Sequence, residues 1–161
     1  MTTATAFDRG ASRYDLMVAL NPGYHRELRR AAKVLAASLG PEREGGLLDL
    51  ACGSGASTRA LVDALPEGTP ITGLDASAGM LEQARRKNWP AGVSFDRAVA
   101  GALDVDAVGR ESFAGVQACY LFRNVPAAER DRAVAEVFAL LRPGGGWLSR
   151  STPSPATRAP G

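Results

Sequence analysis

The stretch LLDLACGSGAST, Leu47–Thr58, decides the fold of this 161-residue chain. It predicts a short buried strand, a glycine-rich turn and the start of a helix, with Asp49 inside the strand. Because Gly53 and Gly55 have no Cβ atom, the turn can adopt positive φ and admit a ligand close to the backbone, and the helix start offers unpaired N–H groups. This arrangement outlines a pocket for a nucleotide cofactor.

A second acidic residue strengthens this interpretation. Asp75 follows another strand-like run, Ile71–Leu74, about 20 residues downstream, where a carboxylate can accept both hydroxyls of a ribose. A dinucleotide-binding turn would read G-x-G-x-x-G, but Thr58 stands where the third glycine would be. Any βαβ unit can carry a single glycine-rich turn, whereas the two features at this spacing argue for a cofactor site that is not a dinucleotide site.

Apolar periodicity alternates between strands and helices along the chain. Strands are expected over residues 47–51, 71–74, 93–95 and 115–122, and helices over about 22–39, over 57–65 and after a capping Ser77. A further helix carries an inward stripe of Val134, Val137, Phe138 and Leu141 and stops before Pro143, while Asp104 and Asp106 are expected in a loop. The fold class is therefore α/β: a doubly wound, Rossmann-like parallel sheet with helices on both faces and a ligand cleft at the carboxyl ends of its strands.

Composition sets the outer limits. The chain is 45% hydrophobic and 22% charged, enough for one soluble domain, and its net charge of +2 gives no reason to expect a nucleic-acid partner. It has no apolar leader and no membrane-spanning run, so a cytoplasmic location is expected. Cys52 and Cys119 are predicted to be buried reduced thiols, and no motif supports a disulfide between them.

Several motifs together resemble those of a known family. DLACGSG followed by LDASAGMLEQAR resembles motifs I and II of class I S-adenosylmethionine-dependent methyltransferases. The opening FDRGASRYDLM and the later segment YLFRNVP are similar to those of the ubiquinone/menaquinone biosynthesis C-methyltransferases, the demethylmenaquinone methyltransferase-like family. The resemblance covers nearly all of Phe7–Gly145, and Arg123-Asn124-Val125 combined with the Tyr14 segment is its more specific part.

The resemblance implies S-adenosylmethionine as cofactor and assigns roles to particular residues. Gly53 and Gly55 would face the methionine part, Asp75 the ribose, and the backbone around Val99 and Ala100 the adenine. Arg123 and Asn124 would lie beside the methyl acceptor, with Arg123 stabilising an oxyanion, and Tyr14 would join them as a catalytic residue or simply pack the N-terminal helix. The cofactor-binding residues implied are Asp49, Gly53, Gly55, Thr58, Asp75, Ala76, Met80, Val99 and Ala100.

The reaction that the resemblance implies is C-methylation of a demethylmenaquinone-like quinol. Such a displacement needs alignment, deprotonation of the acceptor hydroxyl and exclusion of water, with no metal and no covalent intermediate. The partners expected are thus a small-molecule or lipid-quinol substrate. The arginine cluster near His25 is either a solvated helix face or a contact with anionic lipid headgroups at a membrane surface, and His25 itself is expected to be solvated.

The sequence departs from the family after its third strand. Many class I enzymes carry Gly-Asp or Asn-Ala there to hold the adenine amino group, whereas Ala98-Val99-Ala100 offers no side-chain acceptor. Reduced cofactor affinity is expected.

The end of the chain departs further. The family pattern has a fifth apolar strand there, followed by helices and two more strands, whereas this chain ends GWLSRSTPSPATRAPG. We expect an N-terminal helical cap segment over 1–40, a cofactor-binding domain over 41–148 with at most a short fifth strand at Trp147 and Leu148, and a disordered tail over 149–161. The sheet would then be incomplete at its C-terminal edge, and the isolated chain prone to aggregation.

A frameshift is one hypothesis for this ending. Back-translated with GC-rich codons and read from the last base of the Gly146 codon, these residues permit Leu-Val-Val-Ala-Glu-Tyr-Ser-Val-Ala-Gly-Asp, a plausible strand. The nucleotide sequence of the gene would test this.

Two classes of function stay open at this point. The first is a methyltransferase, for a quinol or for another small molecule. The second is an inactive, truncated remnant that at most binds cofactor, or a cofactor-binding half that a separate chain completes.

Overall fold

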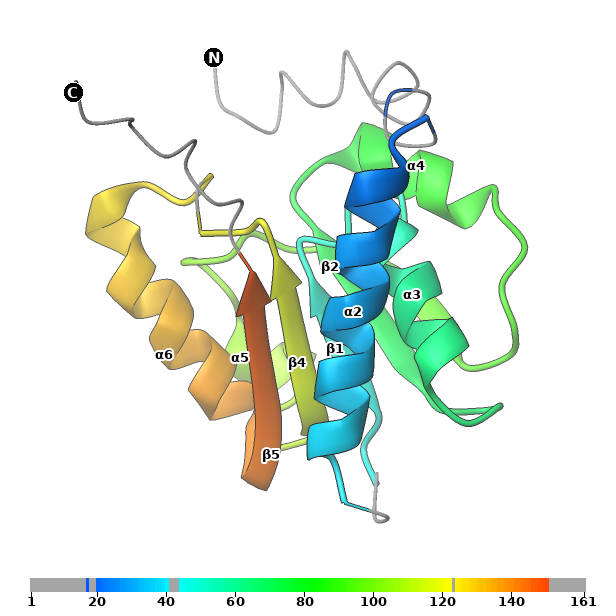
Figure 1. Cartoon of the computed structure of the whole chain (residues 1–161). Coiled ribbons are helices and arrows are strands. Elements are labelled where there is room, and N and C mark those ends of the chain that lie inside the picture. The colour runs from blue at the N-terminus through cyan, green and yellow to red at the C-terminus, as the bar shows by residue number, and fades with distance from the viewer. Residues whose placement is uncertain (1–16, 18–19, 41–43, 123, 151–161) are drawn as a thin grey trace, which may run out of the picture.

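Strand β1 (Leu47–Leu50) occupies the centre of a five-stranded sheet, and all four of its residues, three leucines and Asp49, are buried. The structure is a computed structural model and describes residues 17, 20–40, 44–122 and 124–150. The strands run parallel in the order β3-β2-β1-β4-β5 (Figure 1). The remaining strands are β2 (Ile71–Asp75), β3 (Val93–Arg97), β4 (Phe113–Cys119) and β5 (Leu141–Arg150). The predicted doubly wound α/β fold is confirmed.

Helices cover both faces of this sheet (Figure 1). On one face, α2 (Pro22–Ser38) and α3 (Ala56–Ala64) share a hydrophobic cluster with inward residues of β1 and β2, such as Leu47 and Ile71. On the other, α5 (Val105–Val108) and α6 (Arg130–Leu140) pack on Leu48, Leu50 and Val116. The helix α4 (Ala78–Arg85) packs beside β2 and β3, and a 3-10 turn, η1 (Ala127–Glu129), precedes α6. Alternate residues of the central strands therefore serve two cores, which is why these strands read as continuous apolar runs.

Several helix ends are fixed by side chains that the sequence places there. The Asn21 side chain accepts a hydrogen bond from the Tyr24 N–H at 3.1 Å before α2, and Ser77 Oγ accepts one from the Met80 N–H at 3.2 Å before α4. Such caps satisfy N–H groups that the helix itself leaves unpaired. The predicted cap at Ser77 is thus confirmed, and it fixes where the chain turns after β2.

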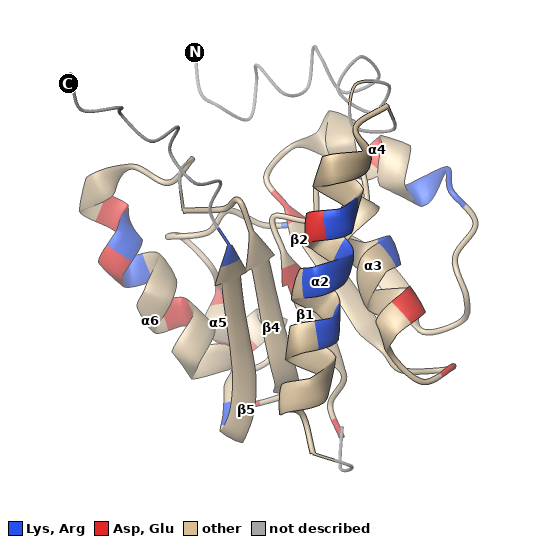
Figure 2. Cartoon of the chain, viewed as in Figure 1, with Lys and Arg blue, Asp and Glu red and all other residues tan. Residues whose placement is uncertain are grey.

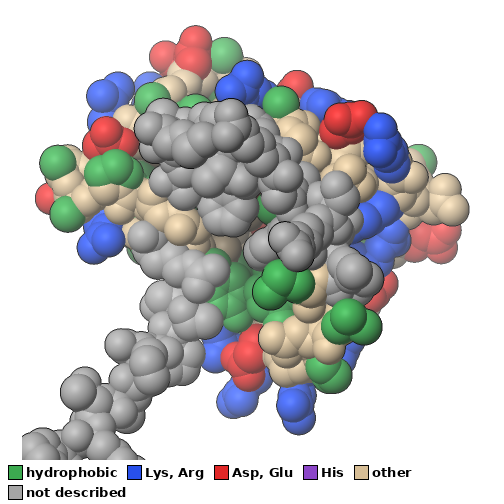
Figure 3. All heavy atoms as spheres, turned by 90° about the horizontal axis from the view of Figure 1, so that it is seen from above, with side chains coloured by type: hydrophobic (Ala, Val, Ile, Leu, Met, Phe, Trp, Pro, Cys, Tyr) green, Lys and Arg blue, Asp and Glu red, His purple; other side chains and the backbone are tan. Residues whose placement is uncertain are grey.

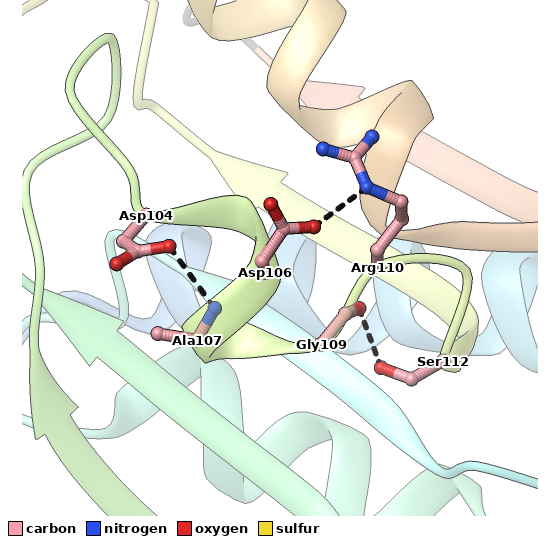
Figure 4. Close-up of polar contacts among 6 residues, drawn as sticks. All are labelled: Asp104, Asp106, Ala107, Gly109, Arg110 and Ser112. Atoms are coloured by element: carbon pink, nitrogen blue, oxygen red, sulfur yellow. Dashed lines mark hydrogen bonds and ion pairs between the residues drawn. The ribbon is translucent and has the colours of Figure 1, made fainter.

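The segment around α5 corrects the expectation of a plain loop (Figure 4). Asp104 Oδ1 accepts a hydrogen bond from the Ala107 N–H at 3.1 Å and so caps α5, while Asp106 accepts one from Arg110 Nε at 2.7 Å. Ser112 Oγ donates to the Gly109 carbonyl at 2.6 Å. One helical turn is too short to show apolar periodicity, so the sequence pattern could not reveal it.

Other boundaries differ at the carboxyl half of the chain. Strand β4 ends at Cys119 instead of residue 122, because Tyr120 has φ 60° and leaves the extended conformation. Helix α6 ends at Leu140, and Phe138 is 57% exposed instead of lying in the core stripe.

Strand β5 is longer than the short fifth strand that the sequence predicted. It begins at Leu141, passes through Pro143 and pairs with β4 as far as Arg150, so it includes the first two residues of the predicted tail, Ser149 and Arg150. Most of its residues are only partly buried or exposed, so the strand is held mainly by its backbone pairing with β4 and less by apolar burial.

Charge is distributed unevenly over the helices (Figure 2). Lys and Arg recur along α2, whereas acidic and basic residues alternate along α6. Among the residues that the structure describes, no helix combines the length and the apolar character needed to span a bilayer.

Candidate cofactor and acceptor site

A cavity of about 550 Å³ lies at the carboxyl ends of the strands. This size falls in the range of small-molecule sites, and the position is the usual ligand crevice of an open α/β sheet. Seen from this end, a group of hydrophobic side chains is visible below the centre of the view, and charged side chains are distributed around the rim (Figure 3). The cavity is lined by Tyr24 and by residues 50–54, 56–57, 75–77, 80, 97–100, 119–121, 124–126 and 129.

The glycine turn after β1 forms one wall. Ala51, Gly53 and Gly55 have φ of 63°, 56° and 98°, so the backbone is left-handed at alternate residues. A Cβ placed on Gly53 would meet no atom within 4 Å, and Gly53 lines the cavity, so this position leaves room for a ligand. A Cβ on Gly55 would lie 2.7 Å from the Trp89 ring, and Gly55 does not line the cavity. Glycine is therefore needed at the two positions for different reasons. Gly53 leaves space for a ligand, and Gly55 leaves space for the Trp89 side chain.

Asp75, at the end of β2, faces the cavity opposite this turn. Its Oδ2 accepts a hydrogen bond from the Gly53 N–H at 2.8 Å, and its Oδ1 accepts one from the Ser77 N–H at 2.9 Å. A carboxylate that faces a cavity can accept hydrogen bonds from donors such as ribose hydroxyls. Asp75 thus joins the loops that follow β1 and β2 while facing the ligand space.

Asp49 lies behind the cavity wall and not in it. Its Oδ2 accepts hydrogen bonds from Ser57 Oγ at 2.7 Å and Thr58 Oγ1 at 2.6 Å, so it fixes the first turn of α3 to β1. Burial raises the pKa of Asp49 to about 6, against the opposing effect of these hydrogen bonds. Asp49 Oδ1 and Oε1 of its cross-strand neighbour Gln117 are buried acceptors without a hydrogen-bond partner among the described residues, an arrangement that suits a protonated carboxyl group.

The segment after β3 forms a second wall. Arg97, Ala98, Val99 and Ala100 line the cavity, and the next residues are held by a carboxylate of α6. Glu136, which is 6% exposed, accepts hydrogen bonds from the Gly101 N–H at 2.7 Å and the Leu103 N–H at 3.0 Å. Two bonds to one buried carboxylate fix this segment against α6.

The end of β4 and helix α2 supply an aromatic wall. The rings of Tyr24 and Tyr120 stack with centroids 5.4 Å apart and an angle of 22° between their planes. Asn124 lines the cavity and donates from Nδ2 to the Tyr120 carbonyl at 3.3 Å. Arg123 and Tyr14, the other two predicted catalytic residues, lie outside the described residues.

Two thiols complete the lining. Cys52 and Cys119 are buried and free, as predicted. Burial raises the pKa of the Cys119 thiol to about 12 and that of Cys52 further. Both are therefore neutral near pH 7, and they act as apolar wall rather than as nucleophiles.

Six of the nine predicted cofactor-binding residues line the cavity, namely Gly53, Asp75, Ala76, Met80, Val99 and Ala100. The other three, Asp49, Gly55 and Thr58, lie behind the wall, where their effect on a ligand would be indirect. Sequence reasoning missed Tyr24, Tyr120 and Glu129. The only sequence signals for these residues are their positions: Tyr24 follows the helix-capping Asn21, Tyr120 follows the end of β4, and Glu129 directly precedes α6.

Comparison with known proteins decides the family. The profile of the family described as "Methyltransferase domain" matches residues 47–145, more than half of the chain. The chain belongs to the methyltransferase domain family. The predicted resemblance is confirmed, and the cofactor of this methyltransferase domain is S-adenosylmethionine.

Individual relatives show how far the likeness extends. The chain is 33% identical over 151 residues to a ubiquinone/menaquinone biosynthesis C-methyltransferase of Desulfotalea psychrophila. The aligned region covers 93% of this chain and 58% of the relative. It is 34% identical over 146 residues to a malonyl-[acyl-carrier protein] O-methyltransferase of Enterobacter lignolyticus, covering 88% of the chain and 50% of that protein. The methyltransferase domain described here thus spans about half the length of the curated relatives that it matches.

Solved structures agree. A putative methyltransferase in complex with the Haloferax volcanii Trm112 activator superposes with a TM-score of 0.70 at 28% identity, over 92% of this chain and 59% of that one. The protein in the DhpI-SAM-HEP complex superposes with a TM-score of 0.63 at 25% identity, over 88% and 60%.

Proposed function

We propose that the chain transfers the methyl group of S-adenosylmethionine to a ring carbon of a demethylmenaquinone-like quinol. The observation that carries the proposal is the cavity itself, in which the open side of Gly53 and the Asp75 carboxylate face one ligand space at the carboxyl ends of β1 and β2. The named relatives that act in quinone biosynthesis support this choice of acceptor.

The described residues fit the cofactor in chemistry and in space. Asp75 has acceptor capacity for ribose hydroxyls, Gly53 leaves room beside the backbone for the methionine part, and Val99 and Ala100 offer apolar contact to the adenine. Ala76 and Met80 add lining on the Asp75 side. Asp49, Gly55 and Thr58 would act by holding the glycine turn in shape.

The aromatic wall supports a flat acceptor. The stacked rings of Tyr24 and Tyr120 line the cavity together with the apolar Leu121 and Val125. A quinol ring would make aromatic and apolar contacts there. Asn124 would orient an acceptor hydroxyl. Arg123 and Tyr14 are proposed, from the family resemblance, to stabilise the oxyanion and to contact the acceptor.

Bound S-adenosylmethionine supplies an electrophilic methyl group on a sulfonium centre. In the proposed reaction the ring carbon forms a bond to that methyl carbon, the carbon–sulfur bond breaks with its electron pair left on sulfur, and the ring then loses a proton. The chain's residues would hold the two reactants in line, bind the acceptor oxygen and exclude water. The neutral thiols of Cys52 and Cys119 would not compete for the methyl group.

Calorimetric titration with S-adenosylmethionine and S-adenosylhomocysteine, followed by a methyl-transfer assay with a demethylmenaquinone analogue, tests the proposal. Arg123→Ala should lower turnover and leave cofactor affinity near normal, because Arg123 is assigned to the acceptor. Absence of cofactor binding would contradict the whole proposal, and binding without turnover would favour a cofactor-binding remnant or half.

Another acceptor is a second candidate. A malonyl-[acyl-carrier protein] O-methyltransferase matches this chain at 34% identity, as high as the quinone-biosynthesis relatives. Assaying a malonyl thioester beside the quinol analogue separates the two.

We also propose that the basic face of α2 contacts anionic lipid headgroups when a lipid-soluble acceptor is used. Arg26, Arg29, Arg30 and Lys33 are exposed together along α2 and line one shallow hollow. The acidic residue of the helix, Glu27, is paired with Arg150 Nη2 at 2.7 Å, so it does not neutralise this face.

A further inference from the structure

The cavity lacks a side-chain acceptor where the adenine amine is expected. Ala98, Val99 and Ala100 line this wall, and none of their side chains can accept a hydrogen bond. An exocyclic amine that lost its water there without gaining an acceptor would weaken binding. A side-chain acceptor for the adenine amine would therefore have to come from another element.

Glu129 reaches the same wall from the opposite side of the site. It belongs to η1, directly before α6, and it lines the cavity. Its Oε2 and its Cβ each lie 3.4 Å from the position that a Cβ on Gly101 would take. Gly101 directly follows Ala100, so the carboxylate lies beside the segment that would contact the adenine. The structure records no hydrogen bond or ion pair of this side chain with any described residue.

Glu136 of α6 holds the segment beside Glu129 in place. Seven residues further along the chain, its carboxylate accepts hydrogen bonds from the Gly101 and Leu103 N–H groups, which ties the adenine wall to the helix that directly follows Glu129. The wall and the Glu129 carboxylate are thus held by one element.

We propose that Glu129 accepts a hydrogen bond from the exocyclic amine of the cofactor's adenine, in place of the acceptor that the segment after β3 lacks. This inference rests on the proposed function, because it assumes that S-adenosylmethionine occupies this cavity. A carboxylate accepts hydrogen bonds and does not donate them, so Glu129 favours an amine over a carbonyl at this point of the purine. Glu129 would then be a specificity-determining residue for adenine.

A pair of ligands tests that contact. S-adenosylhomocysteine carries the amine, whereas S-inosylhomocysteine carries a carbonyl oxygen in its place and a proton on the adjacent ring nitrogen. Calorimetry should show that the unchanged chain prefers the adenosyl compound by about tenfold or more, as expected for a hydrogen bond to a charged group. Glu129→Ala should weaken S-adenosylhomocysteine binding by about tenfold and reduce the preference for it over S-inosylhomocysteine.

Glu129→Gln gives a readout that a structural role would not move. The amide can donate to the inosine carbonyl, so this variant should gain affinity for S-inosylhomocysteine relative to the unchanged chain. Asp131→Ala, an exposed acidic residue of the same helical turn that does not line the cavity, is the matched control and should keep the original ratio. Melting curves of all variants would show that they remain folded.

The outcomes separate this inference from the function on which it rests. If the unchanged chain binds S-adenosylhomocysteine but Glu129→Ala keeps both its affinity and its preference, the role of Glu129 is overturned and the proposed function stands. If the unchanged chain binds neither ligand, both are overturned.

Discussion

At the scale of single residues, the Asp75 carboxylate is the group on which the cofactor proposal depends most. It accepts hydrogen bonds from the Gly53 and Ser77 N–H groups and faces the cavity, where we propose that it accepts two ribose hydroxyls. Each hydrogen bond to a charged group contributes about 1.5–3 kcal/mol, so Asp75→Ala should weaken S-adenosylhomocysteine binding by about ten- to a hundredfold or more. Calorimetric titration measures this, with Asp96→Ala on the exposed side of β3 as control. Equal affinity of the two variants would remove the ribose assignment.

Asp49 gives a prediction about pH. Burial raises its pKa to about 6, so between pH ~4 and ~6 the folded chain holds a proton that the unfolded chain has lost. Its contribution to stability is therefore complete below pH ~4 and is lost as the pH rises through about 6, a change of about 3 kcal/mol.

Asn cannot titrate, so the Asp49→Asn variant should not lose this stability. Between pH ~4 and ~6, its free energy of unfolding should rise by about 3 kcal/mol relative to that of the unchanged chain. Urea titrations from pH 4 to pH 8 compare the two, and parallel curves would contradict the buried protonated carboxyl group.

Sequence reasoning found the residues of the site that follow a strand in a recognisable motif. Gly53 and Asp75 could be predicted because a glycine turn and a strand-ending carboxylate leave local signals. Tyr120 could not, since a left-handed φ at a residue other than glycine leaves none. Glu129 reaches the cavity from an element 28 residues beyond Gly101, and only the three-dimensional packing brings the two together.

At the scale of elements, α6 supports the site through Glu136. The buried carboxylate accepts the Gly101 and Leu103 N–H groups, and Gln at this position could keep only one of those bonds. We expect Glu136→Gln to lower the free energy of unfolding by about 2 kcal/mol and to weaken cofactor binding through a loosened wall. Glu82→Gln, which removes one partner of an exposed ion pair with Arg86, should cost less than about 1 kcal/mol. Equal unfolding free energies for the two variants would show that the Glu136 bonds contribute little.

Helix α2 makes a prediction about membranes. Near an anionic surface each Lys or Arg contributes about 1 kcal/mol, so replacing both Arg26 and Arg30 by Gln should reduce partition to phosphatidylserine-containing vesicles by about thirtyfold. Arg86→Gln with Arg110→Gln removes the same charge from other surfaces and should have little effect. Co-sedimentation at two salt concentrations measures both pairs, and an equal loss in both would mean that only net charge matters.

Apart from the short α5 and η1, the helices and strands that the structure describes were predicted in type and order, since alternating apolar runs of the two periods are long enough to recognise. Their ends were less predictable where tertiary packing decides them. Helix α6 ends at Leu140, and the next residue, Leu141, pairs with Phe113 of β4. Phe138, which the apolar periodicity predicted to be buried, is exposed. β5 forms despite a composition poor in strand formers, since pairing with β4 from Gly146 to Arg150 satisfies its backbone.

At the scale of the whole molecule, the sheet order places the chain's two tryptophans at opposite edges. Trp89 lies behind the glycine turn beside Phe95 of β3, with the Arg59 guanidinium 4.1 Å from its ring centroid. Trp147 lies in β5, with its ring 5.2 Å from that of Phe138. In the strand order β3-β2-β1-β4-β5, the two rings thus contact opposite edge strands of the sheet, and Trp89 also lies against the turn after β1.

This separation gives the chain two built-in fluorescent reporters, one for each edge of the sheet. Trp147→Phe leaves emission only from the β3 edge, and Trp89→Phe leaves it only from the β5 edge. Because one hydrophobic cluster connects Trp147 to the central strands, both emissions should change at the same urea concentration, as in a single cooperative transition. An earlier change at Trp147 would instead mean that the β5 edge opens on its own, and the same two signals would then report which edge responds when a ligand enters the cavity.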